Sequence, residues 1–175
     1  MNATTWADRT CGAAERESFA GAAEAHLDDV YGYLLYLTGD PTMAEDLTGE
    51  TFEKALRRWR GYDPRRGSAK TWLCQVARST ALDHLRSERR RRRREEVFAP
   101  PERQEQAFVS GLSPALERAV LALSAAEREV IALRVLLDLD GESAARLLGI
   151  SPTACSTRLS RALKKLEEMV SDVEL

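Results

Sequence analysis

The sequence has few residues that bind metals or form disulfides: three cysteines and two histidines among 175 residues. Cys11, Cys74 and Cys155 lie far apart, without a CxxC pair. An odd number of cysteines without metal-ligand spacing is typical of a protein that keeps its thiols reduced. His26 and His84 are isolated, and the sequence has no nucleophile elbow or phosphate-binding loop. We therefore expect a cytoplasmic binding protein with no metal, no cofactor and no catalytic residues.

Long apolar runs and alternating strand patterns are also missing. No stretch approaches the roughly 18 to 20 apolar residues that span a membrane, and no charged-then-apolar leader opens the chain. Apolar residues instead recur at intervals of three and four positions almost throughout the sequence, which is the helical period. The sequence therefore predicts an all-α protein.

Basic residues are scarce in residues 1–53, and acidic residues are scarce in residues 54–94. Residues 1–53 carry eleven acids and two basic residues, Arg9 and Arg16. Residues 54–94 carry fifteen lysines and arginines against three acids. The formal net charge of −2 hides this segregation. Two oppositely charged surfaces indicate two different partners, one of them a nucleic acid.

Three helices are predicted in the first half. One runs from about residue 17 to 37, the next follows Asp40-Pro41, which cap and open a helix, and the third runs from about Ser68 into the six arginines 89–94. A loop rich in glycine and proline, 61–67, precedes the third helix. Their predicted inward faces include Leu27, Val30, Leu34, Leu47, Leu56, Trp59, Trp72, Leu73 and Leu85.

The composition changes after residue 94. Residues 95–112 contain Ala99-Pro100-Pro101 and only a weak apolar pattern, which predicts a flexible linker. The first residues are small and polar. We therefore expect a disordered segment 1–16, a helical domain 17–94, a linker 95–112 and a four-helix domain 113–172.

The second domain is predicted to end in a helix-turn-helix. Helices at about 113–123 and 124–137 come first, the latter opened by a capping box, Ser124 with Glu127. Asp140 then caps a short helix, Gly149 suits the left-handed residue that ends it, and Ser151-Pro152 begin the last helix. Its inward side comprises Cys155, Leu159, Ala162, Leu163 and Leu166.

The other side of this last helix presents hydroxyls and cations, and no acid occurs from residue 143 to 166. Such a helix suits the DNA major groove, where hydroxyls and arginines contact base edges and cations hold phosphates; an ordinary helical hairpin with a solvated face is the alternative. The candidate DNA-binding residues are Thr153, Ser156, Thr157, Arg158, Ser160, Arg161, Lys164 and Lys165.

Two further surfaces are predicted in the first domain. Tyr62 and Trp72 are interleaved with arginines, which suits stacking of a separated DNA strand, although core packing is the alternative for Trp59 and Trp72. The arginine run gives sequence-blind affinity for phosphates, or is a solvated helix end. The acids of the second helix, with no basic residue at i+4 before the pair Glu50 and Lys54, indicate either a basic protein partner or a solvated face.

Several motifs, in this order, resemble bacterial RNA polymerase sigma factors of the extracytoplasmic-function (ECF) group. Residues 44–52, AEDLTGETF, resemble the family's polymerase-clamp helix. Residues 72–79, WLCQVARS, and 83–86, DHLR, resemble its promoter-melting and −10-recognition helix. Residues 129–134, EVIALR, and 147–151, LLGIS, resemble the domain that binds the −35 element.

The resemblance implies partners and roles for these surfaces. Core RNA polymerase would bind through the clamp coiled coil of its largest subunit and through its flap, promoter DNA would be opened by the first domain, and an anti-sigma factor is a further possible partner of a chain that is monomeric when free. The implied polymerase-binding residues are Glu45, Asp46, Gly49, Glu50 and Glu53. The resemblance assigns contact with the −10 element to Tyr62, Arg65, Arg66, Lys70, Trp72, Arg78, Ser79, Asp83 and Arg86.

Three positions depart from the family pattern. Gly49 stands where glutamine is usual, Ser79 where asparagine is usual, and Ser143-Ala144 where a glutamate-isoleucine pair is usual. The glycine costs its helix roughly 1 kcal/mol, and Ser79 leaves the base preference open. The alternative function is a helix-turn-helix regulator that binds DNA without polymerase; an RNA-binding adaptor lacks any known RNA module.

Overall fold

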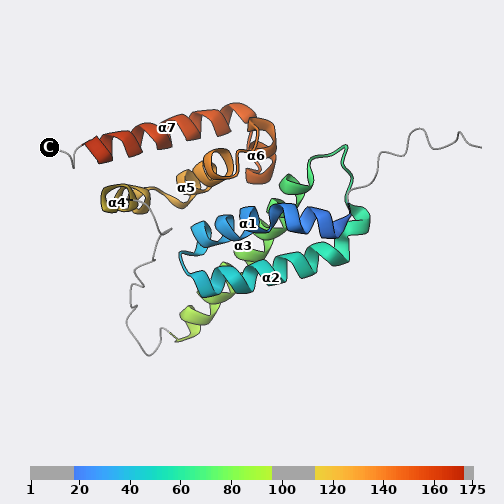
Figure 1. Cartoon of the computed structure of the whole chain (residues 1–175). Helices are drawn as coiled ribbons and strands as arrows, with labels where there is room; N and C mark the ends of the chain where they lie inside the picture. The colour runs from blue at the N-terminus through green and yellow to red at the C-terminus, as the bar shows by residue number, and fades with distance from the viewer. Residues whose placement is uncertain (1–17, 96–112, 172–175) are drawn as a thin grey trace, which may run out of the picture.

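The computed structural model describes residues 18–95 and 113–171, and within these ranges it is helical, as expected (Figure 1). The predicted disordered segment, Cys11 and nearly all of the predicted linker lie outside the described residues. The elements are α1 (Phe19–Thr38), α2 (Pro41–Arg58), η1 (Trp59–Gly61), α3 (Ala69–Glu95), α4 (Pro114–Ala122), α5 (Ala125–Ile131), η2 (Ala132–Leu136), α6 (Gly141–Leu148) and α7 (Pro152–Ser171).

Helices α1, α2 and α3 pack into the first bundle, and local signals set the ends of the first two. The Ser18 hydroxyl accepts a hydrogen bond from the Gly21 amide at 3.1 Å and begins α1. Gly39 ends α1 with φ of 68°, a left-handed conformation that glycine adopts at little cost. Asp40 then accepts hydrogen bonds from the Thr42 and Met43 amides at 2.9 and 3.2 Å. The sequence predicted the turn between these helices correctly.

The buried faces of the helices are narrower than predicted. Val30, Leu34, Leu47 and Leu73 are buried as expected, whereas four predicted core residues are about half exposed: Leu27 (48%), Leu56 (58%), Leu85 (45%) and Leu163 (43%). Successive residues of a helix are rotated by about 100°, so a side chain next to a buried position can point away from the core. That holds for Leu56 and Leu163, which follow Ala55 and Ala162. Leu85 lies beyond Ala81, the last buried residue of α3.

Helices α4 to α7 form the second bundle, with α7 packed on α4, α5 and α6. The Ser124–Glu127 capping box is present. The predicted helix 124–137 instead changes at Ala132 into η2, a π-helical turn in which the Leu137 amide donates to the Ala132 carbonyl at 2.9 Å. Asp140 begins α6, and Gly149 ends it with φ of 68°. The helix-turn-helix is therefore formed as expected.

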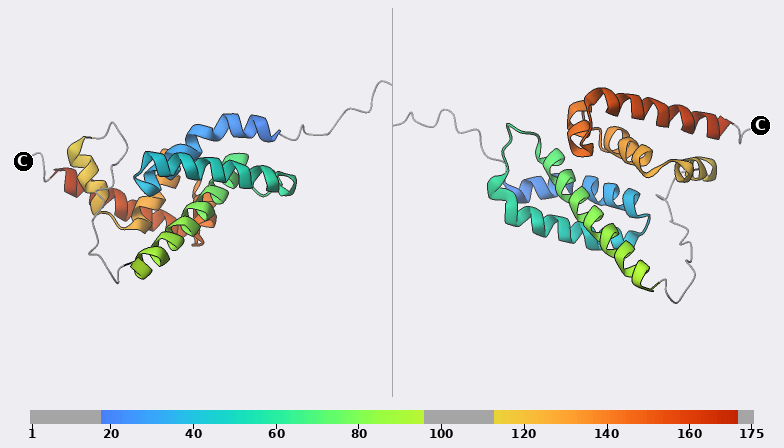
Figure 2. Two further views of the ribbon diagram at one scale, coloured as in Figure 1. Left: turned by 90° about the horizontal axis from the view of Figure 1, so that it is seen from below. Right: turned by 180° about the vertical axis from the view of Figure 1, so that it is seen from behind.

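The two bundles contact each other through α1 and α3 on one side and α5, η2 and α6 on the other (Figures 1 and 2). Arg78 of α3 donates two hydrogen bonds to the Glu129 carboxylate of α5, at 2.7 and 3.3 Å. Tyr33 of α1 donates a third to the same carboxylate at 3.3 Å. At the other end of this contact, Arg146 of α6 donates to the Arg66 carbonyl at 2.5 Å.

No helix in the described ranges combines the length and the apolar character of a membrane-crossing segment.

Candidate protein and nucleic-acid interfaces

The predicted polymerase-binding residues form one exposed face of α2. Glu45, Asp46, Gly49, Glu50 and Glu53 are all exposed, and their spacing places them on one side of the helix. Two of the four acids have cationic partners on the same helix: Glu50 pairs with Lys54 at 2.7 Å, and Glu53 with Arg57 at 2.5 Å. Within the described ranges no ion pair involves Glu45 or Asp46. The N-terminal half of this face is therefore its uncompensated part.

An aromatic cluster joins the end of α2 to the start of α3. Trp59 stacks on Tyr62 with ring centroids 4.7 Å apart, and Trp72 contacts these rings at 5.5 and 5.7 Å. Trp59 and Trp72 are partly buried, which is compatible both with packing in the core and with stacking of a DNA base. The Tyr62 hydroxyl donates to the Gly67 carbonyl at 3.2 Å and holds the loop in a closed turn.

This loop borders a hollow of about 820 Å³ between the two bundles. Tyr62, Arg65, Arg66 and Trp72 of the predicted −10 set line it, so the structure brings these four residues together. Side chains from α6, Ser143 and Arg146 among them, form the other wall. The hollow has the size of a small-ligand pocket, with arginines at its rim and an aromatic ring in its wall.

A second hollow of about 550 Å³ also has Trp72 in its lining. Ser79 of the predicted set lines it together with residues outside that set: the arginines Arg57, Arg58 and Arg60, which the sequence placed near the aromatic residues, and Gln75 and Val76. A signal for Gln75 was available, because Trp72, Gln75 and Ser79 are spaced i, i+3 and i+7 and share one helix face. Nothing in the local sequence brings the arginines of α2 and η1 to this face, because they come from a different element.

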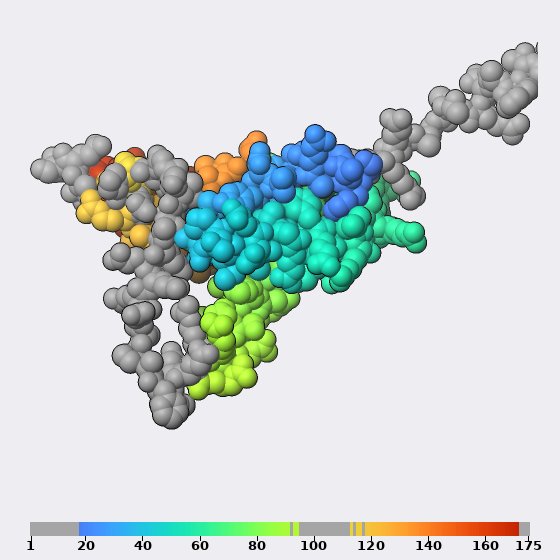
Figure 3. Space-filling view, turned by 60° about the horizontal axis from the view of Figure 1, so that its bottom comes forward, coloured from blue at the N-terminus to red at the C-terminus, as the bar shows by residue number. Residues whose placement is uncertain are grey.

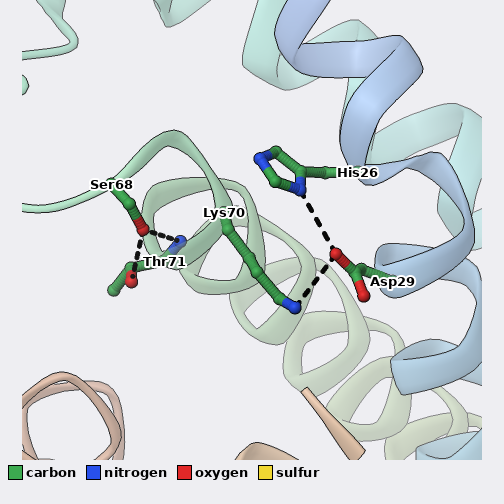
Figure 4. A network of polar contacts seen from close by, with 5 residues as sticks. All are labelled: His26, Asp29, Ser68, Lys70 and Thr71. Carbon is green, nitrogen blue, oxygen red and sulfur yellow. Dashed lines mark hydrogen bonds and ion pairs between the residues drawn. The ribbon is translucent and has the colours of Figure 1, made fainter. Parts of the chain in front are cut away.

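Lys70 of the predicted −10 set lines neither hollow and contacts α1 instead. Its ammonium pairs with the Asp29 carboxylate of α1 at 3.1 Å, and the same oxygen contacts His26 at 3.2 Å (Figure 4). Ser68 accepts a hydrogen bond from the Thr71 amide at 3.2 Å and begins α3 beside this cluster (Figure 4). Lys70 therefore ties α3 to α1.

Arg78 is also occupied, by the second bundle. Burial opposes its positive charge, but the hydrogen bonds and the charge of Glu129 raise the pKa of Arg78 overall. Burial, and then the Glu129 charge, raise the pKa of Tyr33 well above its ordinary value, so this tyrosine remains a hydrogen-bond donor at all physiological pH values. In this conformation Arg78 is a contact between the bundles.

The last two members of the predicted −10 set, Asp83 and Arg86, lie farther along α3 and are exposed. They pair with each other at 3.3 Å. Ion pairs between exposed side chains are weak, so a phosphate can replace the carboxylate at little cost.

The outer side of α7 presents the predicted recognition residues to solvent. Thr153, Ser156, Thr157, Ser160, Arg161 and Lys164 are exposed, whereas Arg158 and Lys165 are partly buried. Lys164 and Lys165 contact Glu168 and Glu127 at 3.7 and 3.5 Å. Arg158 and Arg161 form no ion pair with any residue in the described parts of the chain. Because Cys155 and Ala162 are buried against the bundle, the orientation of this surface is fixed.

Comparison with known protein families accounts for both bundles. The model of sigma-70 region 2 matches residues 22–91, and that of sigma-70 region 4 matches residues 113–166. Two curated bacterial proteins, both ECF sigma factors, are similar along most of the chain. The chain belongs to the ECF group of the sigma-70 family.

Relatives of this ECF sigma factor occur in Streptomyces coelicolor and Bacillus subtilis. It is 32% identical to the ECF RNA polymerase sigma factor BldN of Streptomyces coelicolor over 91% of its own length, and spans 63% of the length of that relative. It is 30% identical to the ECF RNA polymerase sigma factor SigM of Bacillus subtilis, covering 83% of this chain and 91% of the relative. A solved structure with the same fold is that of the sigma factor RpoE from Bartonella quintana, in complex with the anti-sigma factor NepR. Its TM-score is 0.74 at 21% sequence identity, and the match covers 89% of this chain and 98% of that chain.

Proposed function

We propose that this ECF sigma factor binds core RNA polymerase, recognises the −10 and −35 elements of promoters and helps to separate the DNA strands. One observation supports this most directly: the first bundle exposes an acidic helix face and also contributes Trp72 and arginines to the lining of two hollows. The first suits a basic protein surface, and the second suits an unpaired nucleic-acid strand. A DNA-binding regulator that works without polymerase would need only the second.

The polymerase contact is assigned to α2. Glu45, Asp46, Gly49, Glu50 and Glu53 would meet the clamp coiled coil of the largest subunit. Glu45 and Asp46 contribute most in this proposal, because they have no ion pair to lose within the described chain. Glu50 and Glu53 must exchange Lys54 and Arg57 for the partner's cations, which reduces their net gain.

Strand separation is assigned to the loop 61–67 and the outer face of α3. Unstacking a base costs a few kcal/mol, which contacts with the displaced base must offset. Stacking on an aromatic ring contributes about 1–3 kcal/mol per base. Trp72 lines both hollows, and arginines from η1 and the loop can bind the flanking phosphates. The −35 element would be read by α7 in the major groove.

The protein is proposed to act in the cytoplasm, as a binding protein and not as an enzyme. The solved structure with a TM-score of 0.74 is a sigma factor in complex with the anti-sigma factor NepR. We include a partner of this class in the proposal for this chain.

Run-off transcription with core polymerase on genomic fragments tests the function directly. A specific transcript that requires this chain would support it, and would supply the promoter sequence. Absence of any transcript, with polymerase shown to be active with another sigma factor, would refute it.

A pull-down of core polymerase separates this function from a regulator that ignores polymerase. The variant Asp46→Ala with Glu50→Ala should retain much less polymerase than the wild type. The matched control is Glu24→Ala with Asp28→Ala, which removes two exposed acids of the same i, i+4 spacing from α1. Equal retention by both variants would remove the assignment of the clamp contact to α2.

A further inference from the structure

The C-terminal half of α3 extends beyond the bundle as an arm. Ala81 is the last buried residue of this helix, and from residue 82 to 94 no described side chain is buried. At 1.5 Å per residue these thirteen positions extend about 20 Å. Figures 2 and 3 show this end of α3 projecting away from the other helices of its bundle. Packing against the bundle therefore does not explain why the helix continues.

The arm is strongly basic and has little internal compensation. Between residues 86 and 94 it carries seven arginines and one acid. Glu88 pairs with Arg91 at 3.3 Å within the helix. Arg89, Arg90 and Arg93 have no ion pair with any residue of the described chain. Like charges three and four residues apart destabilise a helix, and the helix dipole favours cations only in the last turn. A polyanionic partner would remove this repulsion.

The arm presents Arg86, Arg89, Arg90 and Arg93 on the same side as the proposed DNA-reading residues. Trp72, Ser79, Arg86 and Arg93 follow one another at intervals of seven residues, which rotates each by only about 20° relative to the last. Arg89 and Arg90 fall on either side of this line. The face that holds Lys70 against α1 is on the opposite side of the helix. One continuous surface thus leads from Trp72 to the end of the arm.

The chemistry of the arm favours double-stranded DNA. Residues 82–94 contain no phenylalanine, tyrosine or tryptophan, and sequence-tolerant binding of single strands uses such rings for stacking. Leu82 and Leu85 are its only large apolar residues, too few for a membrane-binding face. Arginines along one face suit a row of phosphates.

The order of the chain indicates which duplex lies there. The surface proposed to read the −10 element precedes the arm, and the domain proposed to read the upstream −35 element follows it. We propose that Arg89, Arg90 and Arg93 extend the contact of Arg86 onto the phosphate backbone of the duplex between the −10 and −35 elements. From Ser79 to Arg93 the helix spans about 21 Å, or roughly six base pairs at 3.4 Å each. This proposal rests on the proposed function.

The test is the salt dependence of promoter binding by holoenzyme assembled from core polymerase and the full chain. Arg90→Gln with Arg93→Gln removes two charges from the proposed face, and Arg91→Gln with Arg94→Gln removes two from a face about 100° away. Glutamine and arginine have similar helix propensities, so the helix should persist. Each lost phosphate contact lowers the slope of log K against log salt by about 0.9. The first pair should therefore reduce the slope by about 1.8, and the second pair should change it little.

The DNA probes are a promoter fragment that the wild-type holoenzyme transcribes and the same fragment with neutral methylphosphonate linkages between its two elements. The difference between Arg90→Gln/Arg93→Gln and wild type should disappear on the neutral fragment. Equal slopes for wild type and both variants on the charged fragment, equal losses in both variants, or a difference that persists on the neutral fragment would overturn the proposal. An unchanged slope with weaker crosslinking of the arm to the transcript would assign it to RNA instead. If the wild-type holoenzyme transcribes no fragment, the proposed function itself fails.

Discussion

The contact between the two bundles can be tested by replacing Glu129 with glutamine. This carboxylate accepts two hydrogen bonds from Arg78, at 2.7 and 3.3 Å, and one from Tyr33 at 3.3 Å. Glutamine has nearly the same shape but no charge. Glu127→Gln is the matched control: it lies on the same helix, faces Ser124 and Lys165, and can keep its capping role as glutamine.

The expected magnitude follows from the burial of the pair. Hydrogen bonds to charged groups contribute about 1.5–3 kcal/mol, against about 0.5–1.5 kcal/mol for neutral ones. Losing the charge at both Arg78 bonds would therefore cost about 2–3 kcal/mol in a fully buried site. The side chains of Arg78 and Glu129 are 25% and 15% exposed, so solvent screening reduces this to about 1–2 kcal/mol. The equilibrium between closed and open arrangements should then shift roughly 5- to 30-fold.

A double-mutant cycle of urea unfolding measures this coupling. Arg78→Met and Glu129→Gln, alone and together, should show a coupling energy of about 1–2 kcal/mol, whereas Arg78→Met and Glu127→Gln should be additive. Because the proposed function gives Arg78 a second role in binding DNA, Glu129→Gln should also increase the affinity of the chain for single-stranded −10 DNA. Sites that do not interact are additive within about 0.5 kcal/mol, so a coupling energy below about 0.5 kcal/mol would show that this contact does not hold the bundles together.

Two further predictions concern the second bundle. Arg158→Ala or Arg161→Ala should weaken binding of holoenzyme to promoter duplex that contains the −35 element; gel-shift affinities unchanged by both would place the recognition surface elsewhere. Asp140→Ala should lower the free energy of unfolding at pH 7 by about 1 kcal/mol, because it removes the cap of α6. The hydrogen bonds from Ser143 lower the pKa of Asp140, so the carboxylate stabilises the fold above its ordinary pKa and loses this effect as the pH falls through the lowered value. Unfolding curves at pH 7 and 3 check this: a difference from wild type as large at pH 3 would mean that the charge contributes nothing.

Much of the fold could be predicted because its signals are local. Asp40-Pro41, the Ser124–Glu127 box and Gly149 each act within four residues of themselves, and each stands where the sequence placed it. The π-helical turn at Ala132 was not predictable, since no residue pattern separates it from an ordinary helix end. Leu56 was placed inside because periodicity gives the apolar side of a helix, while the neighbouring helices decide how much of that side is covered.

The sequence predicted the exposed residues of one candidate surface correctly, but it did not predict the ion pairs formed by two residues of another. The acidic face of α2 could be read from spacing alone, and all five of its residues are exposed. Lys70 and Arg78 have the same charge and lie on the same helix as Arg86, yet they pair with Asp29 and Glu129. These partners are 41 and 51 positions away in the sequence, and composition cannot select one carboxylate among many. A family resemblance indicates the role of a residue. It does not indicate which residue of the same chain that side chain pairs with when no partner is bound.

The register of α3 accounts for how one helix can serve three purposes. At about 100° per residue, Lys70 lies opposite the line of Trp72, Ser79, Arg86 and Arg93, while Arg78 lies about a quarter turn from it. Lys70 can therefore hold α1 and Arg78 can hold α5 while the outer line remains available to DNA. The contact of Lys70 with α1 and the binding of DNA by the outer line are compatible at all times. Arg78, however, cannot bind Glu129 and a phosphate at once. If Arg78 contacts promoter DNA, it must first release Glu129, and the Glu129 cycle measures that part of the cost of separating the bundles.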